Sequence, residues 1–154
     1  MKNIPEMIAS RESEEIKFKA SFGKEVIETL CAFANHKGGI VLVGVEHSGK
    51  IAGITCGPET VQTWVNQIKQ STIPSIIPDI ELSREEGKQV AVIRIGEFPV
   101  KPVAFRDRYF KRVANSNHRL SVTEIANLHL QSLQLSWDSH PSGRSTLADL
   151  ATDK

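Results

Sequence analysis

The sequence predicts one α/β domain of the mixed α+β kind, with a mixed β-sheet and about three helices. Its 154 residues match the usual length of one domain, which can bury a core of its own. Helical periodicity and β-branched runs both occur, but they do not alternate strictly as in a βαβ series. An apolar content of 40% and a charged content of 24% are typical of a globular domain.

Three segments have helical character. Residues 24–35 carry apolar side chains at helical spacing, with no glycine or proline inside. Residues 58–72 begin at a proline, a residue favoured in the first turn of a helix, and place an apolar stripe on one face. A third helix can be capped by Ser121 or Thr123 and continues to Leu133.

The remaining ordered segments predict short strands. Residues 40–45 form a continuous apolar run, and residues 80–82 and 89–95 flank a polar turn that predicts a hairpin. The other strand candidates are 15–19, 51–54 and 108–113, and 115–120 is expected to be a polar loop.

The expected domain spans residues 12–135. Residues 1–11 are expected to be a short lead-in, and residues 136–154 a linker or disordered tail because they are polar and contain Pro141 and Gly143. A tail of this kind indicates the N-terminal module of a longer protein with a further C-terminal region.

A glycine pair separates the first helix from the long apolar strand. A phosphate loop needs its glycines before a helix N-terminus, whereas Gly38 and Gly39 follow a helix and precede a strand. Neither GxxxxGK[ST] nor GxGxxG occurs. Gly38, Gly39 and Gly44 are therefore predicted to be structural, with the pair closing the helix, and no cofactor is expected.

Residues 101–119 form a basic stretch in a chain whose net charge is only +1. Six lysines and arginines stand against Asp107, and strand alternation separates Arg108 and Arg112 from Tyr109. Guanidinium groups bind phosphates through forked hydrogen bonds, and an aromatic ring can stack on a base. The alternative is a solvated strand face. The residues predicted to contact nucleic acid are Arg106, Arg108, Tyr109, Lys111, Arg112, Asn117 and Arg119.

Acidic side chains before the first strand and after the long one could hold a divalent metal. The catalytic candidates are Glu12, Glu14 and Glu46, because grouped carboxylates can orient a phosphodiester through Mg²⁺ or Mn²⁺. Solvated charge on an edge strand is the alternative. The five histidines show no metal-ligand spacing, so no metal site is predicted.

Five blocks in order carry a family resemblance. They are ESEEIKFK (12–19), AFANHKGGIVLVGVEHSGKIAG (32–53), IPSIIPDI (73–80), QVAVIRIGEFPVKPV (89–103) and YFKRVANSNHRLSVTEIANL (109–128). The chain resembles the AlbA-like DNA-binding domain of the Schlafen superfamily over residues 10–130. The resemblance implies an α/β nucleic-acid-binding domain of a bacterial or archaeal transcriptional regulator or helicase-related protein.

Some members of that family are metal-dependent ribonucleases with three acids. Carried over by motif, the first acid is Glu12, the second position holds Lys17, and the third holds His47 with Glu46 just before it. A charged lysine cannot ligate a metal and repels it. The resemblance therefore favours a binding module over an enzyme, with Mg²⁺ or Mn²⁺ needed only if a divergent nuclease activity exists.

The sequence is compatible with three functions: a domain that binds DNA or RNA, a divergent Schlafen-type nuclease with an incomplete acidic triad, and a protein-interaction scaffold. No apolar run approaches the length of a membrane span, so no membrane partner is expected and the expected location is the bacterial cytoplasm. Whether the chain forms a homo-oligomer stays open.

Overall fold

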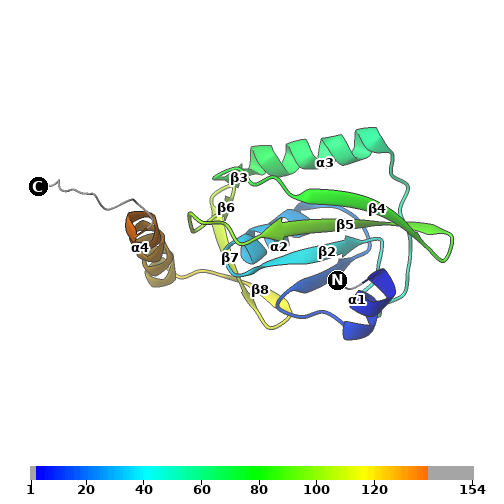
Figure 1. Ribbon diagram of the computed structural model, residues 1–154, viewed down its shortest axis with the longest axis horizontal. Coiled ribbons are helices and arrows are strands. Elements are labelled where there is room, and N and C mark those ends of the chain that lie inside the picture. The colour runs from blue at the N-terminus through cyan, green and yellow to red at the C-terminus, as the bar shows by residue number, and fades with distance from the viewer. Residues whose placement is uncertain (1–2, 139–154) are drawn as a thin grey trace, which may run out of the picture.

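The computed structural model describes residues 3–138, and it confirms a mixed α+β fold (Figure 1). The helices are α1 (Ile4–Ser10), α2 (Lys24–Ala34), α3 (Pro58–Ser71) and α4 (Val122–Asp138). The strands are β1 (Ile16–Lys19), β2 (Gly38–Val43), β3 (Thr72–Ile73), β4 (Asp79–Glu85), β5 (Lys88–Gly96), β6 (Ala104–Phe105), β7 (Arg108–Val113) and β8 (Ser116–Arg119).

The main sheet has the strand order β1-β2-β5-β4 and is mixed, because β1 pairs with β2 in parallel while the other pairs are antiparallel. The predicted hairpin is confirmed as β4 and β5. Its two-residue turn places Glu86 at φ 53° and Gly87 at φ 76°. Two positive φ values match the tight turn whose twist fits antiparallel strands.

The second sheet has the order β3-β6-β7-β8. Its last strand covers residues 116–119, so the prediction of an irregular loop over 115–120 is wrong there. Ser116–Arg119 is polar and a poor strand former in isolation, but it pairs residue by residue with β7, from Val113 opposite Ser116 to Phe110 opposite Arg119. Pairing in the folded sheet overrides local propensity.

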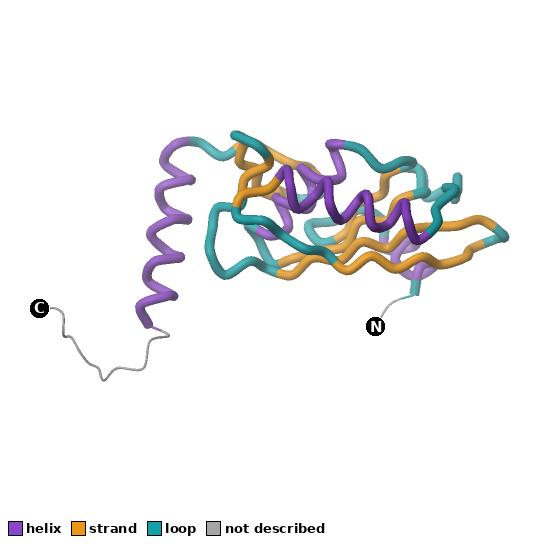
Figure 2. The backbone as a smooth tube through the Cα atoms, turned by 90° about the horizontal axis from the view of Figure 1, so that it is seen from above, coloured by secondary structure: helices purple, strands orange, loops and turns teal. Residues whose placement is uncertain are grey.

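The largest part of the core lies between the two sheets and is built around α2. Leu30 and Phe33 of α2 are fully buried against Val41 of β2, Ile93 of β5 and Phe110 of β7. Helix α3 covers the same face of the main sheet. The opposite face carries a smaller core, covered by the short helix α1. Helix α4 lies at one end of this body in both views (Figures 1 and 2), where its Ser132 hydroxyl accepts from the Lys101 backbone amide at 2.7 Å.

The glycine pair belongs to β2, so the prediction that it closes the preceding helix is wrong. Helix α2 ends at Asn35, which has φ −81° and whose backbone amide donates to the Cys31 carbonyl at 3.0 Å. Gly38 has φ +84°, and a Cβ there would lie 2.7 Å from the Ile95 carbonyl oxygen. A Cβ at Gly39 would lie 2.7 Å from the Phe33 ring. Close approach of β5 and Phe33 thus demands glycine at both positions.

The first and the last helix of the described region each begin with a capping box. At the N-terminus, the Asn3 side chain accepts from the Glu6 amide at 2.9 Å, and this starts α1 inside the segment expected to be a lead-in. Ser121, rather than Thr123, caps α4 by accepting from the Glu124 amide at 3.1 Å. Residues 136–138 continue α4, and 139–154 lie outside the described residues. Within residues 3–138 no helix is long and apolar enough to cross a bilayer.

Candidate nucleic-acid interface

Three arginines of the basic stretch gather at one end of the second sheet. Arg106 lies in the two-residue turn between β6 and β7, because Phe105 pairs with Arg108. Arg119 of β8 lies opposite Phe110, and this places it diagonally from Arg108. All three are exposed, and no ion pair in the described part of the chain includes any of them. We call Arg106, Arg108 and Arg119 the basic surface.

Arg106 is held in a fixed position despite its exposure. Its φ is 58°, its backbone amide donates to the Ser71 carbonyl at 2.7 Å, and its guanidinium lies 5.1 Å from the centre of the Phe105 ring. A guanidinium over an aromatic face is attracted to the ring while its edge stays open to another ligand. Tyr109 is half-buried beside this turn, and its carbonyl accepts from the Leu120 amide at 2.9 Å.

Two other cations of the stretch are neutralised by carboxylates of the same chain. Lys111 pairs with Glu124 at the start of α4, and Lys101 pairs with Glu97. The Lys111 ammonium and the Ser121 amide hold the pKa of Glu124 down to about 2. These two lysines are therefore less available to phosphate than the basic surface is.

Arg112 was predicted to contact nucleic acid, and the structure contradicts this. The residue is 4% exposed, and its guanidinium donates to the Ser13 carbonyl at 2.9 Å, the Ile16 carbonyl at 3.3 Å and the Asn117 side-chain oxygen at 3.0 Å. Burial lowers its pKa, against the opposite pull of nearby carboxylates. The physical reason is strand alternation combined with position: Arg112 shares the inward face of β7 with Phe110, within the part of β7 that pairs with β8, whereas Arg108 on the same face is the exposed first residue of the strand.

Asn117 serves the same internal network. Its amide donates to the Thr29 hydroxyl of α2 at 2.8 Å, while its side-chain oxygen accepts from Arg112. The residue is only half-buried, but both ends of its amide are occupied. This network joins β8, β7, α2 and the segment before β1. It therefore helps to fix the two strands that carry Arg108 and Arg119.

The three positions at which nucleases of the resembling family carry acids meet at one place. Glu12 Oε1 lies 3.4 Å from Lys17 Nζ, and Glu12 Oε2 lies 3.3 Å from His47 Nδ1. The Phe18 backbone amide donates to Glu12 Oε1 at 3.0 Å. The Glu12 side chain is only 13% exposed. The three side chains are thus neighbours, and an ammonium and an imidazole stand where the resemblance implies two carboxylates.

The other two acidic candidates do not complete a metal site. Glu14 Oε1 lies 3.8 Å from His36 Nε2, and Glu46 lies exposed at the rim of a separate hollow next to His47. In the described part of the chain, no three His, Cys, Asp or Glu side chains are grouped as metal ligands. A divalent cation does not fit the residues present. The Lys17 ammonium already pairs with the Glu12 carboxylate, and its positive charge would repel a cation bound there.

The environment of Glu12 predicts a pH dependence of stability. Burial raises its pKa, but the Phe18 amide, the Lys17 ammonium and His47 together outweigh that effect and hold the pKa below the usual 4.5. A carboxyl with a lowered pKa stabilises the fold above its ordinary pKa, and this stability is lost as the pH falls through the lowered value.

Glu12→Gln should therefore lower the free energy of unfolding near neutral pH and flatten its decrease below pH 4.5. Urea unfolding at a series of pH values measures this. Glu14→Gln is the matched control, since its carboxyl is more exposed. Equal pH profiles for wild type and Glu12→Gln would contradict the role assigned to Glu12.

Comparison with known proteins gives a consistent family and fold. The family model described as Schlafen, AlbA_2 matches residues 12–121. The DIP2311 protein from Corynebacterium diphtheriae has a similar fold at 20% identity and a TM-score of 0.63, covering 75% of this chain and 23% of its own. This chain therefore spans less than a quarter of that protein.

A second solved structure comes from Nitrosomonas europaea. It is the N-terminal domain of a protein described as related to the ATP-dependent DNA helicase RecG. The two share 21% identity with a TM-score of 0.54, over 79% of this chain and 95% of that domain. At such identities the two structures show the fold alone.

Proposed function

This chain belongs to the Schlafen AlbA_2 family, and we propose that it is a nucleic-acid-binding domain, with DNA as its main ligand. It contacts phosphates through the basic surface and acts as the N-terminal module of a larger transcriptional regulator or helicase-related protein. The observation that carries the proposal is the set of three exposed arginines, Arg106, Arg108 and Arg119, that lie together and have no internal ion pair in the described region.

The basic surface has the chemistry that phosphate binding needs. Arginine presents planar, charge-assisted donors that match phosphate oxygens, and two of the three arginines lie on paired strands, which hold them at a fixed spacing. Tyr109 lies in the same hairpin and could stack on an exposed base. Contacts of this kind are independent of sequence and sensitive to salt.

The proposal of DNA rather than RNA as the main ligand is supported by a protein of similar fold and not by the basic surface itself. The Nitrosomonas europaea domain belongs to a protein described as related to a DNA helicase, and its fold is similar to that of this chain. Phosphates of DNA and RNA offer the same oxygens to arginine, so the experiment below includes both.

The nuclease alternative has less support. It would require a metal beside Glu12, where Lys17 and His47 lie. A protein-interaction role has one specific observation in its favour: Ile73, Val100 and Leu133 are all more than half exposed. Exposed apolar side chains of this size favour a protein partner when they form a patch.

The arginine triple variant Arg106→Ala/Arg108→Ala/Arg119→Ala should bind nucleic acid at least about tenfold more weakly at low salt. The cause is the loss of phosphate contacts, since these exposed side chains hold no ion pair in the described region. Fluorescence anisotropy with labelled duplex DNA, single-stranded DNA and hairpin RNA measures the affinity.

The matched control removes three exposed cations elsewhere, as Lys24→Ala/Lys50→Ala/Arg84→Ala, so that net charge changes equally. It should retain most of the affinity. Equal losses in the two triple variants would mean that only net charge matters and would contradict a localised surface. Absence of binding by wild type to all three probes would move the assignment to a protein partner.

A further inference from the structure

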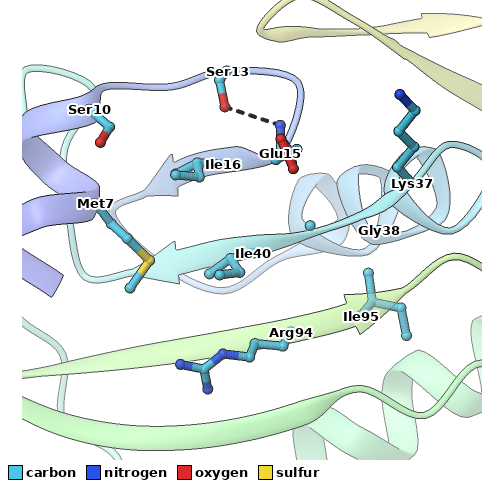
Figure 3. A pocket seen from close by; sticks show the side chains of 11 residues that line it. Met7, Ser10, Ser13, Glu15, Ile16, Lys37, Gly38, Ile40, Arg94 and Ile95 are labelled. Carbon is cyan, nitrogen blue, oxygen red and sulfur yellow. Dashed lines mark hydrogen bonds between the residues drawn. The ribbon is translucent and has the colours of Figure 1, made fainter. Parts of the chain in front are cut away.

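A groove of about 660 Å³ lies on the face of the main sheet that α1 covers only in part (Figure 3). Its floor is a row of side chains across three strands, because Ile16 pairs with Ile40 and Ile40 pairs with Arg94. Met7 of α1 closes one side. None of the residues that line the groove belongs to the basic surface.

The floor continues as bare backbone at one end of the strands. Gly38 of β2 pairs with Gly96 of β5, so two neighbouring strands carry no side chain at this level. A Cβ at Gly96 would meet no atom within 4 Å. The space beside Gly96 is therefore open at this end of the groove.

Charged groups of both signs border the apolar floor. Glu15 comes directly before β1, and its carbonyl accepts from the Ile40 amide at 2.8 Å. Lys37 is exposed, directly before Gly38, and takes part in no ion pair of residues 3–138. Arg94 lies further along the floor, with Nη1 3.5 Å from Glu81. A ligand that fills the groove can therefore pair with the Lys37 ammonium and with the Glu15 carboxylate.

We propose that this groove binds a nucleoside phosphate. The base lies on Ile16, Ile40 and the bare backbone at Gly38, the phosphate pairs with Lys37, and the Glu15 carboxylate accepts from an amino or hydroxyl group of the nucleoside. The groove has a volume typical of small-ligand sites, which combine an apolar lining with a few polar groups. A purely hydrocarbon ligand would make no use of the charges of Lys37 and Glu15.

The ligand has two sources with the same chemistry: a free nucleotide, or one unpaired nucleotide of a bound strand. The second source rests on the proposed function and would make the groove a contact for single strands, separate from the basic surface. The first source is independent of that function, so a failure of one proposal can be told apart from a failure of the other.

Methyl NMR of the full chain, labelled at isoleucine and methionine, tests the proposal. The probes are adenosine monophosphate, adenosine and a single-stranded oligonucleotide. Saturable shifts at Ile16 and Ile40 are expected with adenosine monophosphate at millimolar concentrations, and adenosine should bind about tenfold more weakly. Shifts with the oligonucleotide alone would assign the site to a bound strand.

Two substitutions and one control keep the test specific. Gly96→Leu fills the open floor, and Lys37→Glu removes the phosphate partner. Each should weaken binding about tenfold, while Lys24→Glu, with the same charge change outside the groove, should not. The arginine triple variant should keep the mononucleotide shifts. Absence of shifts with both adenosine monophosphate and the oligonucleotide, or shifts that neither groove variant reduces, would overturn the proposal.

Discussion

Replacing Arg112 with methionine is expected to lower the free energy of unfolding by about 3 kcal/mol. The guanidinium is the donor for the Ser13 and Ile16 carbonyls and for the Asn117 side chain, and it lies 5.1 Å from the centre of the Phe33 ring. Methionine keeps much of the volume but no donor. The two carbonyls would then lose their side-chain partner, and Asn117 would lose one of its own.

Urea unfolding followed by circular dichroism measures the effect. Arg108→Met is the matched control, because it makes the same change on the same strand at an exposed position, and it should cost less than about 0.5 kcal/mol. Arg112→Lys should also be destabilising, since one ammonium cannot reproduce the fork. A small and equal effect of both methionine variants would contradict the assignment of Arg112 to the core.

The double variant Lys17→Glu/His47→Glu is expected to gain affinity for Mn²⁺. It places two new carboxylates beside Glu12, whose oxygens lie 3.4 Å from Lys17 Nζ and 3.3 Å from His47 Nδ1. Three carboxylates at such distances repel one another and favour a divalent cation between them. At Mn²⁺ of about 100 times its dissociation constant, the variant should gain about 2.7 kcal/mol of stability.

Thermal unfolding with and without Mn²⁺ checks this expectation, with Lys17→Gln/His47→Gln as the control that removes the same two side chains without adding a carboxylate. Wild type and control should show no rise in melting temperature. A rise in all three proteins would mean that Mn²⁺ binds elsewhere. No rise in the glutamate variant would mean that these positions do not retain the geometry of a metal site.

The elements with strong periodicity can be predicted from the sequence. Helix α2, strand β2 and the β4–β5 hairpin have patterns in which local preference and burial agree. In strand β8 and helix α1, local preference and burial do not agree in this way. Strand β8 is polar and exists because β7 pairs with it, and α1 is a single short segment whose Asn3 capping box was the available signal.

The candidate site could be predicted only in part. Alternation correctly separated Arg108, Phe110 and Arg112 from Tyr109 and Lys111, but the pattern alone does not say which face points inward. Phe110 on the face of Arg112 was a signal that this arginine is internal, although the same face also carries Arg108, which stays exposed as the first residue of the strand. The contact of Glu12 with His47 joins residues 35 positions apart, so spacing could not predict it and only the family motif placed them together.

In the proposed function, the basic surface binds phosphates directly, without a metal. The most direct test is the salt dependence of DNA affinity for wild type and the arginine triple variant, measured by anisotropy with a chelator present. Loss of three phosphate contacts predicts that wild-type affinity falls about 40-fold more than that of the variant between 50 and 200 mM salt. Parallel salt dependences, or wild-type binding that disappears when the chelator is added, would contradict the claim.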